Sequence, residues 1–188
     1  HQVVVQPGVI YDELNAVLRP YNLFFPPDPG SSTVCTIGGM VANNASGMGA
    51  VKYGITRDYV LKLVAVLPNG QIIRTGSNAI KSSTGYDLVR LLVGSEGTLG
   101  VITEITLRLR TLPPTMKTAV AYFDSVSGTT ETVSEIIGSG LNPAALEFLD
   151  RETILAVNRS EGLGLSERAA MLLTEFHGTE ESASHELE

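Results

Sequence analysis

Apolar residues recur along the first part of the chain in short runs whose spacing predicts strands. Residues 2–5 and 59–67 are rich in valine and leucine, and each run has the length of a buried strand. Pro68, Asn69 and Gly70 follow the second run and predict a hairpin turn, because an Asn-Gly pair readily adopts positive φ. Residues 71–75 then form the returning strand.

A longer run over residues 101–110 alternates between apolar and polar side chains, which predicts a half-exposed strand. Its buried face would carry Ile105, Leu107 and Leu109, and its other face Thr106 and the two arginines that follow. Apolar residues at helical spacing also predict a short amphipathic helix over residues 10–19. Hairpins joined by short turns favour an antiparallel sheet with helices on one side, which is an α+β fold.

A proline pair at Pro113 and Pro114 divides the chain, because proline fixes an extended path and suits a linker. Beyond it, strands and helices alternate. The strands are predicted at residues 118–123, 145–149 and 171–176, and the helices at 130–137, 151–157 and 179–188, the last with Thr179 as its N-cap. We therefore expect two domains, residues 1–112 and residues 115–188.

The composition excludes several classes of protein. Hydrophobic residues make up 43% of the chain and charged residues 18%, which is typical of a globular protein and excludes a disordered tail or a coiled coil. No apolar run approaches the ~20 residues that a membrane helix needs. The net charge is -7 and lysine and arginine form no cluster, so nucleic acid is a poor partner.

Cysteine and histidine offer little chemistry in this sequence. Cys35 is the single cysteine, which excludes an internal disulfide and suits a reducing compartment. No histidine lies near it in the sequence, so a buried thiol is favoured over a catalytic one. His1, His177 and His185 lack the spacing of metal ligands, and we predict no metal site.

Three segments contain more glycine and small polar residues than a structural loop requires: residues 27–32, 36–47 and 94–100. Small residues let a flat or charged ligand approach the backbone, and free amides at a helix start favour phosphate. The alternative is that these are only turns of an antiparallel protein. They match neither the G-x-G-x-x-G fingerprint, nor a Walker A loop, nor a G-x-S-x-G nucleophile elbow.

These segments resemble the FAD-linked oxidases of the vanillyl-alcohol-oxidase type, and most of all the group of flavin-dependent D-lactate dehydrogenases and glycolate oxidase D-subunits. The likeness extends over nearly the whole chain. It rests on residues 27–32, 36–39, 43–47, 52–54 and 94–104, with support from 4–9, 67–70, 81–88, 145–150 and 175–178. The resemblance implies a second FAD-binding subdomain, an antiparallel sheet flanked by helices, followed by the start of a ferredoxin-like cap domain.

The resemblance also implies which residues contact FAD. They comprise a proline-rich turn, the small residues around the predicted helical turn at 38–47, and the glycine-rich loop before residue 101. In full they are Pro29, Gly30, Ser31, Ser32, Thr33, Val34, Cys35, Gly38, Gly39, Ala42, Asn43, Asn44, Ala45, Ser46, Gly47, Tyr53, Gly54, Glu96, Gly97, Thr98, Leu99, Gly100, Val101 and Ile102. Glycine at every third position of 94–100 would leave one edge of that loop without side chains and open for close contact with the cofactor.

The activity implied by the resemblance is oxidation of a D-2-hydroxy acid, of the D-lactate or glycolate type, to the 2-oxo acid by hydride transfer to flavin. The family's first FAD subdomain would precede His1, and its catalytic and metal-binding residues would follow Glu188. We therefore expect a fragment without catalytic residues, which by itself binds FAD weakly or not at all and self-associates to a homodimer.

Two alternatives stay open at this point: a flavin-free orphan or interaction domain, and an NADPH-dependent flavin reductase of the same fold.

In the activity that the resemblance implies, the electrons would pass from the flavin to a protein or a quinone-like acceptor. No presequence is visible, and the expected location is the cytoplasm, or the mitochondrion in a eukaryote.

Overall fold

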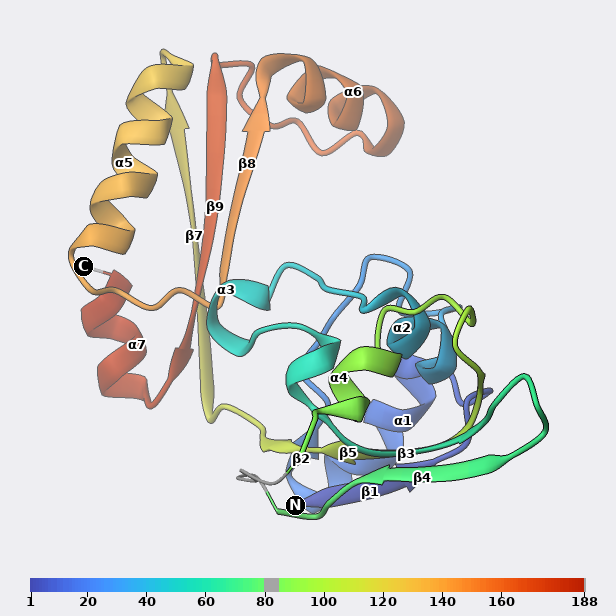
Figure 1. Cartoon of the computed structure of the whole chain (residues 1–188). Coiled ribbons are helices and arrows are strands. Elements are labelled where there is room, and N and C mark those ends of the chain that lie inside the picture. Colours follow the sequence, from blue (N-terminus) through green and yellow to red (C-terminus); the bar gives the residue numbers. More distant parts are fainter. Residues whose placement is uncertain (80–84, 188) are drawn as a thin grey trace. The chain divides into compact units, whose positions relative to one another are not determined.

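The computed structural model describes residues 1–79 and 85–187 and divides into two compact units, His1–Leu112 and Pro113–Glu188. Part of the supporting stretch 81–88 lies outside the described residues. Each unit has its own antiparallel sheet, and each is described by itself below (Figure 1).

The first unit is built on a four-stranded antiparallel sheet in the order β1-β5-β3-β4. Its strands are β1 (Gln2–Val5), β3 (Val60–Val66), β4 (Ile72–Gly76) and β5 (Val101–Arg108). β3 and β4 form the predicted hairpin, in which Gly70 adopts a φ of 83° and Val66 pairs with Ile72. All four strands were predicted within two residues of their observed ends.

Short elements complete the first unit. The helix α1 (Tyr11–Leu18) was predicted, and α2 (Ile37–Asn43) was predicted as a helical turn. The remaining elements were not assigned from the sequence: β2 (Leu23–Phe24), β6 (Arg110–Thr111), α3 (Ala50–Tyr53), α4 (Leu88–Leu92) and the 3-10 turns η1 (Arg19–Tyr21) and η2 (Thr56–Asp58). α1, α2 and α4 lie on one side of the sheet (Figure 1).

The core of the first unit fills the space between the sheet and these helices. Ile37, Met40 and Val41 of α2 are buried together with Leu63 of β3 and Ile105 of β5. Burial of these side chains supplies the main driving force for folding, of the order of 2 kcal/mol for each large one. α2 is therefore fixed rigidly over the centre of the sheet.

One detail of β5 differs from the prediction. Ile105, Leu107 and Leu109 are buried as expected, but Thr106, predicted on a polar face, is also only 4% exposed. β5 lies between β1 and β3, so Thr106 has Val4 on one side and Lys62 on the other, and these cross-strand neighbours shield its side chain from solvent.

The second unit is a three-stranded antiparallel sheet in the order β7-β9-β8 with three helices. The predicted alternation of strand and helix is confirmed. The elements are β7 (Thr115–Phe123), α5 (Val126–Gly138), β8 (Ala145–Asp150), α6 (Arg151–Glu161), β9 (Ala170–Gly178) and α7 (Glu180–Leu187). Ser125 and Asp150 cap α5 and α6, and Thr179 accepts a hydrogen bond from Ser182 N–H at the start of α7, as predicted.

Two helices cover one face of this sheet. Lys117 of β7 forms an ion pair with Glu180 of α7 at 2.6 Å, and Gly128 of α5 lies beside the Phe123 ring. Alternate residues of a strand point to opposite faces. Met116, Val120 and Tyr122 are therefore on the opposite face, called the open face here, and they are 64%, 46% and 40% exposed.

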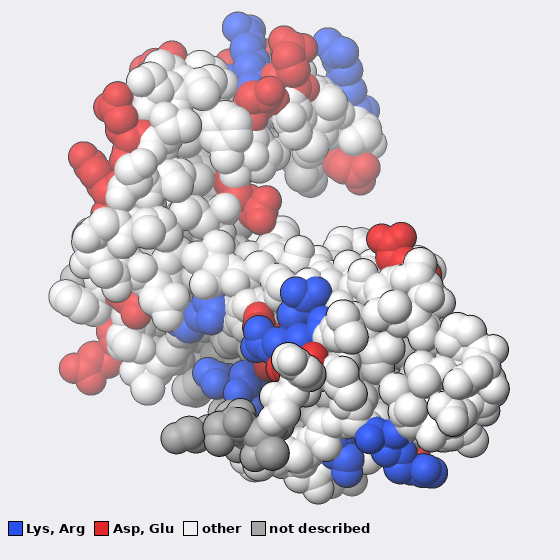
Figure 2. Space-filling view, viewed as in Figure 1, with Lys and Arg blue, Asp and Glu red and all other residues white. Residues whose placement is uncertain are grey.

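The negative charge of the chain is concentrated in the second unit. The sequence up to Leu112 has nine Lys and Arg against seven Asp and Glu, whereas the sequence from Pro113 has four against thirteen. Figure 2 shows acidic side chains scattered over the second unit and basic ones prominent on the first. Among the described residues, no helix is long and apolar enough to cross a membrane.

Candidate functional site

The proline-rich turn and the loop after it run along α2. Asp28 Oδ1 accepts a hydrogen bond from Gly49 N–H at 3.0 Å, next to the segment that follows α2. At the other end of the loop, the Cys35 carbonyl accepts one from Tyr11 N–H, directly before α2 begins. Between these anchors, Gly30, Ser31, Thr33 and Val34 are exposed. The predicted contacts at 29–35 therefore form a surface loop with fixed ends.

The start of α2 shows what the glycine pair does. A Cβ at Gly38 would lie 2.5 Å from Pro7 Cβ, so glycine is needed there for close packing against the segment after β1. The Thr36 hydroxyl caps the helix by accepting a hydrogen bond from Gly39 N–H at 3.0 Å. The close approach expected at Gly38 is thus an approach to the protein's own chain.

The end of α2 is joined to the glycine-rich loop. Gly94 N–H donates to the Val41 carbonyl at 2.9 Å, and Glu96 N–H donates to the Ala42 carbonyl at 3.1 Å. Asn44 ends the helix with a φ of 51°, and Glu96 has a φ of 50°. Two segments that the sequence separates by about fifty residues, both predicted to contact FAD, therefore lie side by side.

The segment after α2 is packed as closely as its small residues suggest. A Cβ at Gly47 would overlap the backbone carbonyl of Asp28, so the proline-rich turn and this segment are in contact through their main chains. Tyr53 packs edge-on against Phe24 and accepts a hydrogen bond from the Tyr59 hydroxyl at its carbonyl, at 2.7 Å. Burial raises the pKa of Tyr59, against the opposing effect of Arg110 and Arg108, which keeps this phenol a neutral donor.

The glycines of the 94–100 loop are not equivalent, which corrects the expectation of one bare edge. A Cβ at Gly97 would meet no heavy atom within 4 Å, whereas at Gly94 it would lie 3.2 Å from the Arg57 guanidinium. At Gly100 it would lie 2.8 Å from the Val66 carbonyl, because the neighbouring strand β3 covers this position. Only Gly97 of the three is open for a ligand. Val101 and Ile102 follow in β5, paired with β3.

Arg57 is a residue of this region that sequence reasoning missed. Its backbone N–H donates to Asn44 Oδ1 at 2.9 Å, and its Nη2 donates to the Val93 carbonyl at 3.0 Å. It lies in η2, a three-residue element without a periodic pattern. The only signal available was its place in the short polar stretch between Gly54 and β3.

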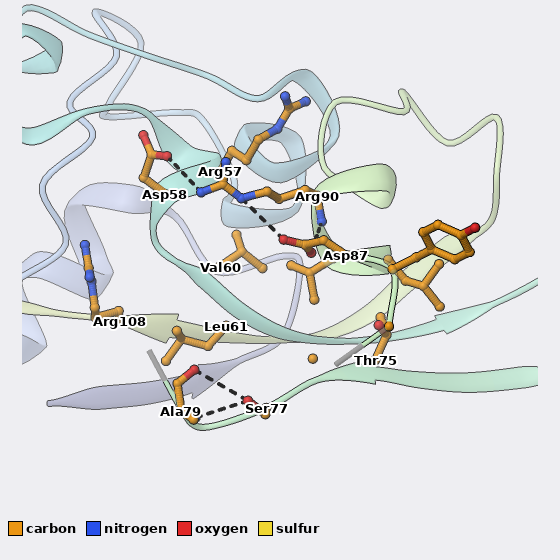
Figure 3. A pocket seen from close by; sticks show the side chains of 15 residues that line it. Arg57, Asp58, Val60, Leu61, Thr75, Ser77, Ala79, Asp87, Arg90 and Arg108 are labelled. Carbon is orange, nitrogen blue, oxygen red and sulfur yellow. Dashed lines mark hydrogen bonds and ion pairs between the residues drawn. The ribbon is translucent and has the colours of Figure 1, made fainter. Parts of the chain in front are cut away.

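A separate pocket of about 340 Å³ lies between β3, β4 and α4 (Figure 3). Arg90 of α4 lies between two carboxylates in it, with Asp58 at 3.5 Å and Asp87 at 3.4 Å. Among the described residues that line this pocket, none belongs to the predicted FAD contacts. The candidate surface is therefore the exposed side of the loops around α2, and not this pocket.

Other chemistry is sparse. Among residues 1–79 and 85–187, no group of three or more His, Cys, Asp and Glu side chains is arranged to hold a metal ion. In the second unit, His177 Nε2 forms a close hydrogen-bond contact with Glu175, whose other oxygen accepts a hydrogen bond from Thr118. Both residues belong to the stretch that carried the resemblance beyond the proline pair.

Both units match families of known proteins. Residues 1–76 match the family model of an FAD binding domain, and residues 112–188 match that of the C-terminal domain of FAD linked oxidases. The chain is 45% identical over 185 residues to the glycolate oxidase subunit GlcD of Bacillus subtilis, covering 98% of this chain and 39% of that protein. It is 48% identical over 178 residues to the mitochondrial D-lactate dehydrogenase [cytochrome] of Arabidopsis thaliana, covering 95% of this chain and 31% of that protein.

A solved structure has the same fold. An alkyldihydroxyacetonephosphate synthase superposes with a TM-score of 0.83 at 22% identity, over 99% of this chain and 37% of that one. The chain thus spans between about a third and two fifths of the length of these relatives.

The candidate surface fits FAD. Gly30 and Gly97 are open at their Cβ positions, so a ligand can lie directly against the backbone there. Arg57 supplies a positive charge behind the loops, and the excess of basic residues in the first unit suits the anionic pyrophosphate of FAD. Together with the matches over both units, this shows that the chain belongs to the FAD-linked oxidases and that FAD is its cofactor.

Proposed function

We propose that the chain forms part of an FAD-dependent oxidoreductase that oxidises a D-2-hydroxy acid, of the D-lactate or glycolate type, to the 2-oxo acid. The observation that carries the proposal is the 39–48% identity to proteins named as glycolate oxidase subunit GlcD and D-lactate dehydrogenase, over almost all of this chain. When bound, FAD supplies the acceptor for the hydride that leaves C2 of the substrate.

The chain's own residues bind and orient the cofactor in this proposal. The 24 residues predicted from the sequence remain the candidate contacts, and the structure ranks them by accessibility. Asn43, Ser46 and Gly97 are exposed around the end of α2, whereas Gly38 and Gly100 are explained by packing within the protein. We assign residues 1–112 to the FAD-binding domain and residues 115–188 to the start of a ferredoxin-like cap domain.

The test is a visible absorption spectrum of the protein expressed at the full length of its natural reading frame. We expect a yellow protein whose 450 nm band, typical of oxidised flavin, bleaches anaerobically on addition of D-lactate or glycolate and not of L-lactate. Selectivity for one enantiomer is expected because the C2 hydrogen must meet one face of the flavin, and the D form is expected because relatives of the chain are named D-lactate dehydrogenase.

Two results would contradict the proposal. Bleaching by NADPH alone would favour a reductase of the same fold, and a protein without flavin would favour an interaction domain. Equal bleaching by both lactate enantiomers would remove the assigned stereochemistry while leaving the flavin chemistry in place.

Partners and location follow from the same reading. We propose that the electrons pass from the flavin to a protein or a quinone-like acceptor, in the cytoplasm or the mitochondrion.

We also propose that the 188-residue chain on its own forms a homodimer. The exposed apolar side chains of the open face of β7 support this last proposal.

A further inference from the structure

Arg57 lies between the two segments that form the centre of the candidate FAD surface. One is the turn at Asn44, which ends α2, and the other is the loop that begins at Gly94. We propose that Arg57 is a positioning residue for FAD binding, which holds these two segments at a fixed separation. The inference rests on the proposed function and adds a residue outside the predicted contacts.

The first contact of Arg57 fixes the turn. Its backbone N–H donates to Asn44 Oδ1 at 2.9 Å, while Asn44 itself has the left-handed φ of 51° that turns the chain out of α2. The residue after Asn44 is also held by hydrogen bonds from η2. Thr56 donates to the Ala45 carbonyl from its backbone N–H at 3.1 Å and from its hydroxyl at 2.7 Å. η2 therefore holds the Asn44–Ala45 turn through three hydrogen bonds.

The second contact fixes the loop through one nitrogen of the guanidinium. Arg57 Nη2 donates to the Val93 carbonyl at 3.0 Å, one residue before Gly94. Gly94 has a φ of 83°, and a Cβ there would lie 3.2 Å from Nη2 and 3.3 Å from Asn44 Cβ. The guanidinium thus packs directly against the loop backbone. A lysine ammonium offers a point charge in place of the planar fork, so it reproduces this contact only in part.

Arg57 also differs from Arg90, which lines the same pocket (Figure 3). Arg90 forms ion pairs with Asp58 and Asp87, and its side chain is 57% exposed. Among the described residues, no carboxylate forms an ion pair with Arg57, and its buried Nε meets no acceptor. Its charge therefore lies without an ion-pair partner next to Gly94 at the start of the loop, where it favours an anionic cofactor.

The test compares variants of the full-length holoprotein. Arg57→Gln removes the charge and the fork, Arg57→Lys keeps the charge, and Asn44→Gly removes the amide acceptor at a position where glycine tolerates the left-handed φ. Arg90→Gln is the matched control, because it makes the same change in the same pocket outside the candidate surface. Three quantities are measured: the FAD dissociation constant by flavin fluorescence, the visible spectrum of the bound flavin, and the melting temperature of the apoprotein.

We expect Arg57→Gln to weaken FAD binding about tenfold or more, since it removes a hydrogen bond made by a charged group. Arg57→Lys should recover part of this loss, Asn44→Gly should weaken binding in the same direction, and Arg90→Gln should leave the constant within about twofold. The flavin spectrum should shift in the Arg57 variants and not in Arg90→Gln, a change that lowered stability alone does not produce.

An FAD dissociation constant in Arg57→Gln equal to that of the wild type would overturn the inference, as would an equal loss in Arg90→Gln. If Arg57→Gln does not fold, Arg57→Lys decides: wild-type affinity and an unshifted flavin spectrum would overturn the inference, and weaker binding with a shifted spectrum would support it. A wild-type protein that binds no FAD would instead contradict the proposed function, so the two failures are distinguishable.

Discussion

At the level of single residues, glycine was the strongest signal in the sequence and also the most ambiguous one. The same density of small residues arises where a ligand approaches the backbone and where two parts of the protein's own chain approach each other. Gly30 and Gly97 are open to solvent, whereas Gly38 and Gly47 are needed for contacts with Pro7 and Asp28. Composition cannot separate these cases, because the neighbours come from distant parts of the sequence.

This difference predicts opposite outcomes for two glycines from the same set of predicted contacts. Gly47→Ala would place a methyl group onto the Asp28 carbonyl, so we expect it to lower the free energy of unfolding by about 2 kcal/mol or more. Gly30→Ala meets open space and should change it by less than about 0.5 kcal/mol. Urea denaturation of both variants measures this, and equal stabilities would show that the Asp28 contact is not close.

Arg57 illustrates the opposite case, in which the sequence gives no signal for a contact that the structure shows. Arginine is usually a solvated surface residue, and nothing in its local sequence marks it as bridging Asn44 and Val93. The bridge exists only because α2 and the start of the 94–100 loop are adjacent in the fold. Residues that hold other segments in place can therefore be identified only from the structure.

At the level of elements, agreement depends on length and on the density of apolar residues, since β1 was predicted although it has only four residues, three of them valine. Strands and helices of eight residues or more, such as β7, β9, α1 and α5, contain enough apolar positions to show a period. α3 has four residues and β2 has two, about one repeat of the helical and the strand period, which is too short to show a period. These short pieces are held by contacts with the rest of the unit, such as that of Tyr53 in α3 with Phe24 in β2.

The contact of α7 with β7 predicts a pH dependence. Lys117, through its hydrogen bond and its charge, lowers the pKa of Glu180 in the folded protein, and Thr115 adds a further hydrogen bond. Because the folded pKa lies below the unfolded one, this ion pair stabilises the second unit above the ordinary glutamate pKa of 4.5. The contribution is lost as the pH falls through the lowered value.

Thermal denaturation of Glu180→Gln and the wild type between pH 3 and pH 7, a range of about four units around the glutamate pKa, measures this effect. We expect the variant to be less stable near neutral pH and to converge with the wild type in acid. Glu181→Gln, at the exposed neighbouring position, is the control and should follow the wild type at both ends. A constant difference across the range would mean that Glu180 stabilises α7 without its charge.

At the level of the whole molecule, the sequence predicted the division at the proline pair and the α+β character of both parts. The net charge of -7 for the whole chain conceals a separation of charge, between a first unit with a basic excess and a strongly acidic second unit. Charge distribution becomes informative only when it is counted over structural units. A basic excess in the first unit agrees with an anionic cofactor, and an acidic second unit affects how copies of the chain associate.

The open face of β7 and this acidic charge together predict how the 188-residue chain self-associates. Apolar contact through Met116, Val120 and Tyr122 favours a dimer, while repulsion between two acidic units opposes it. Salt screens the repulsion and leaves the apolar contact in place. We therefore expect the dimer fraction to rise with ionic strength, whereas a dimer held by ion pairs would dissociate.

Sedimentation velocity at low and high salt measures this fraction, and two valines of similar exposure provide the variant and its control. Val120→Asp places a charge on the open face, where Val120 is 46% exposed, and should yield a monomer at every salt concentration. Val126→Asp makes the same change at a residue 48% exposed in the first turn of α5, away from that face, and should dimerise as the wild type does. A dimer that persists in Val120→Asp, or that weakens as salt is added, would place the contact on another surface. That result would also remove the support that the open face gives to the proposed homodimer.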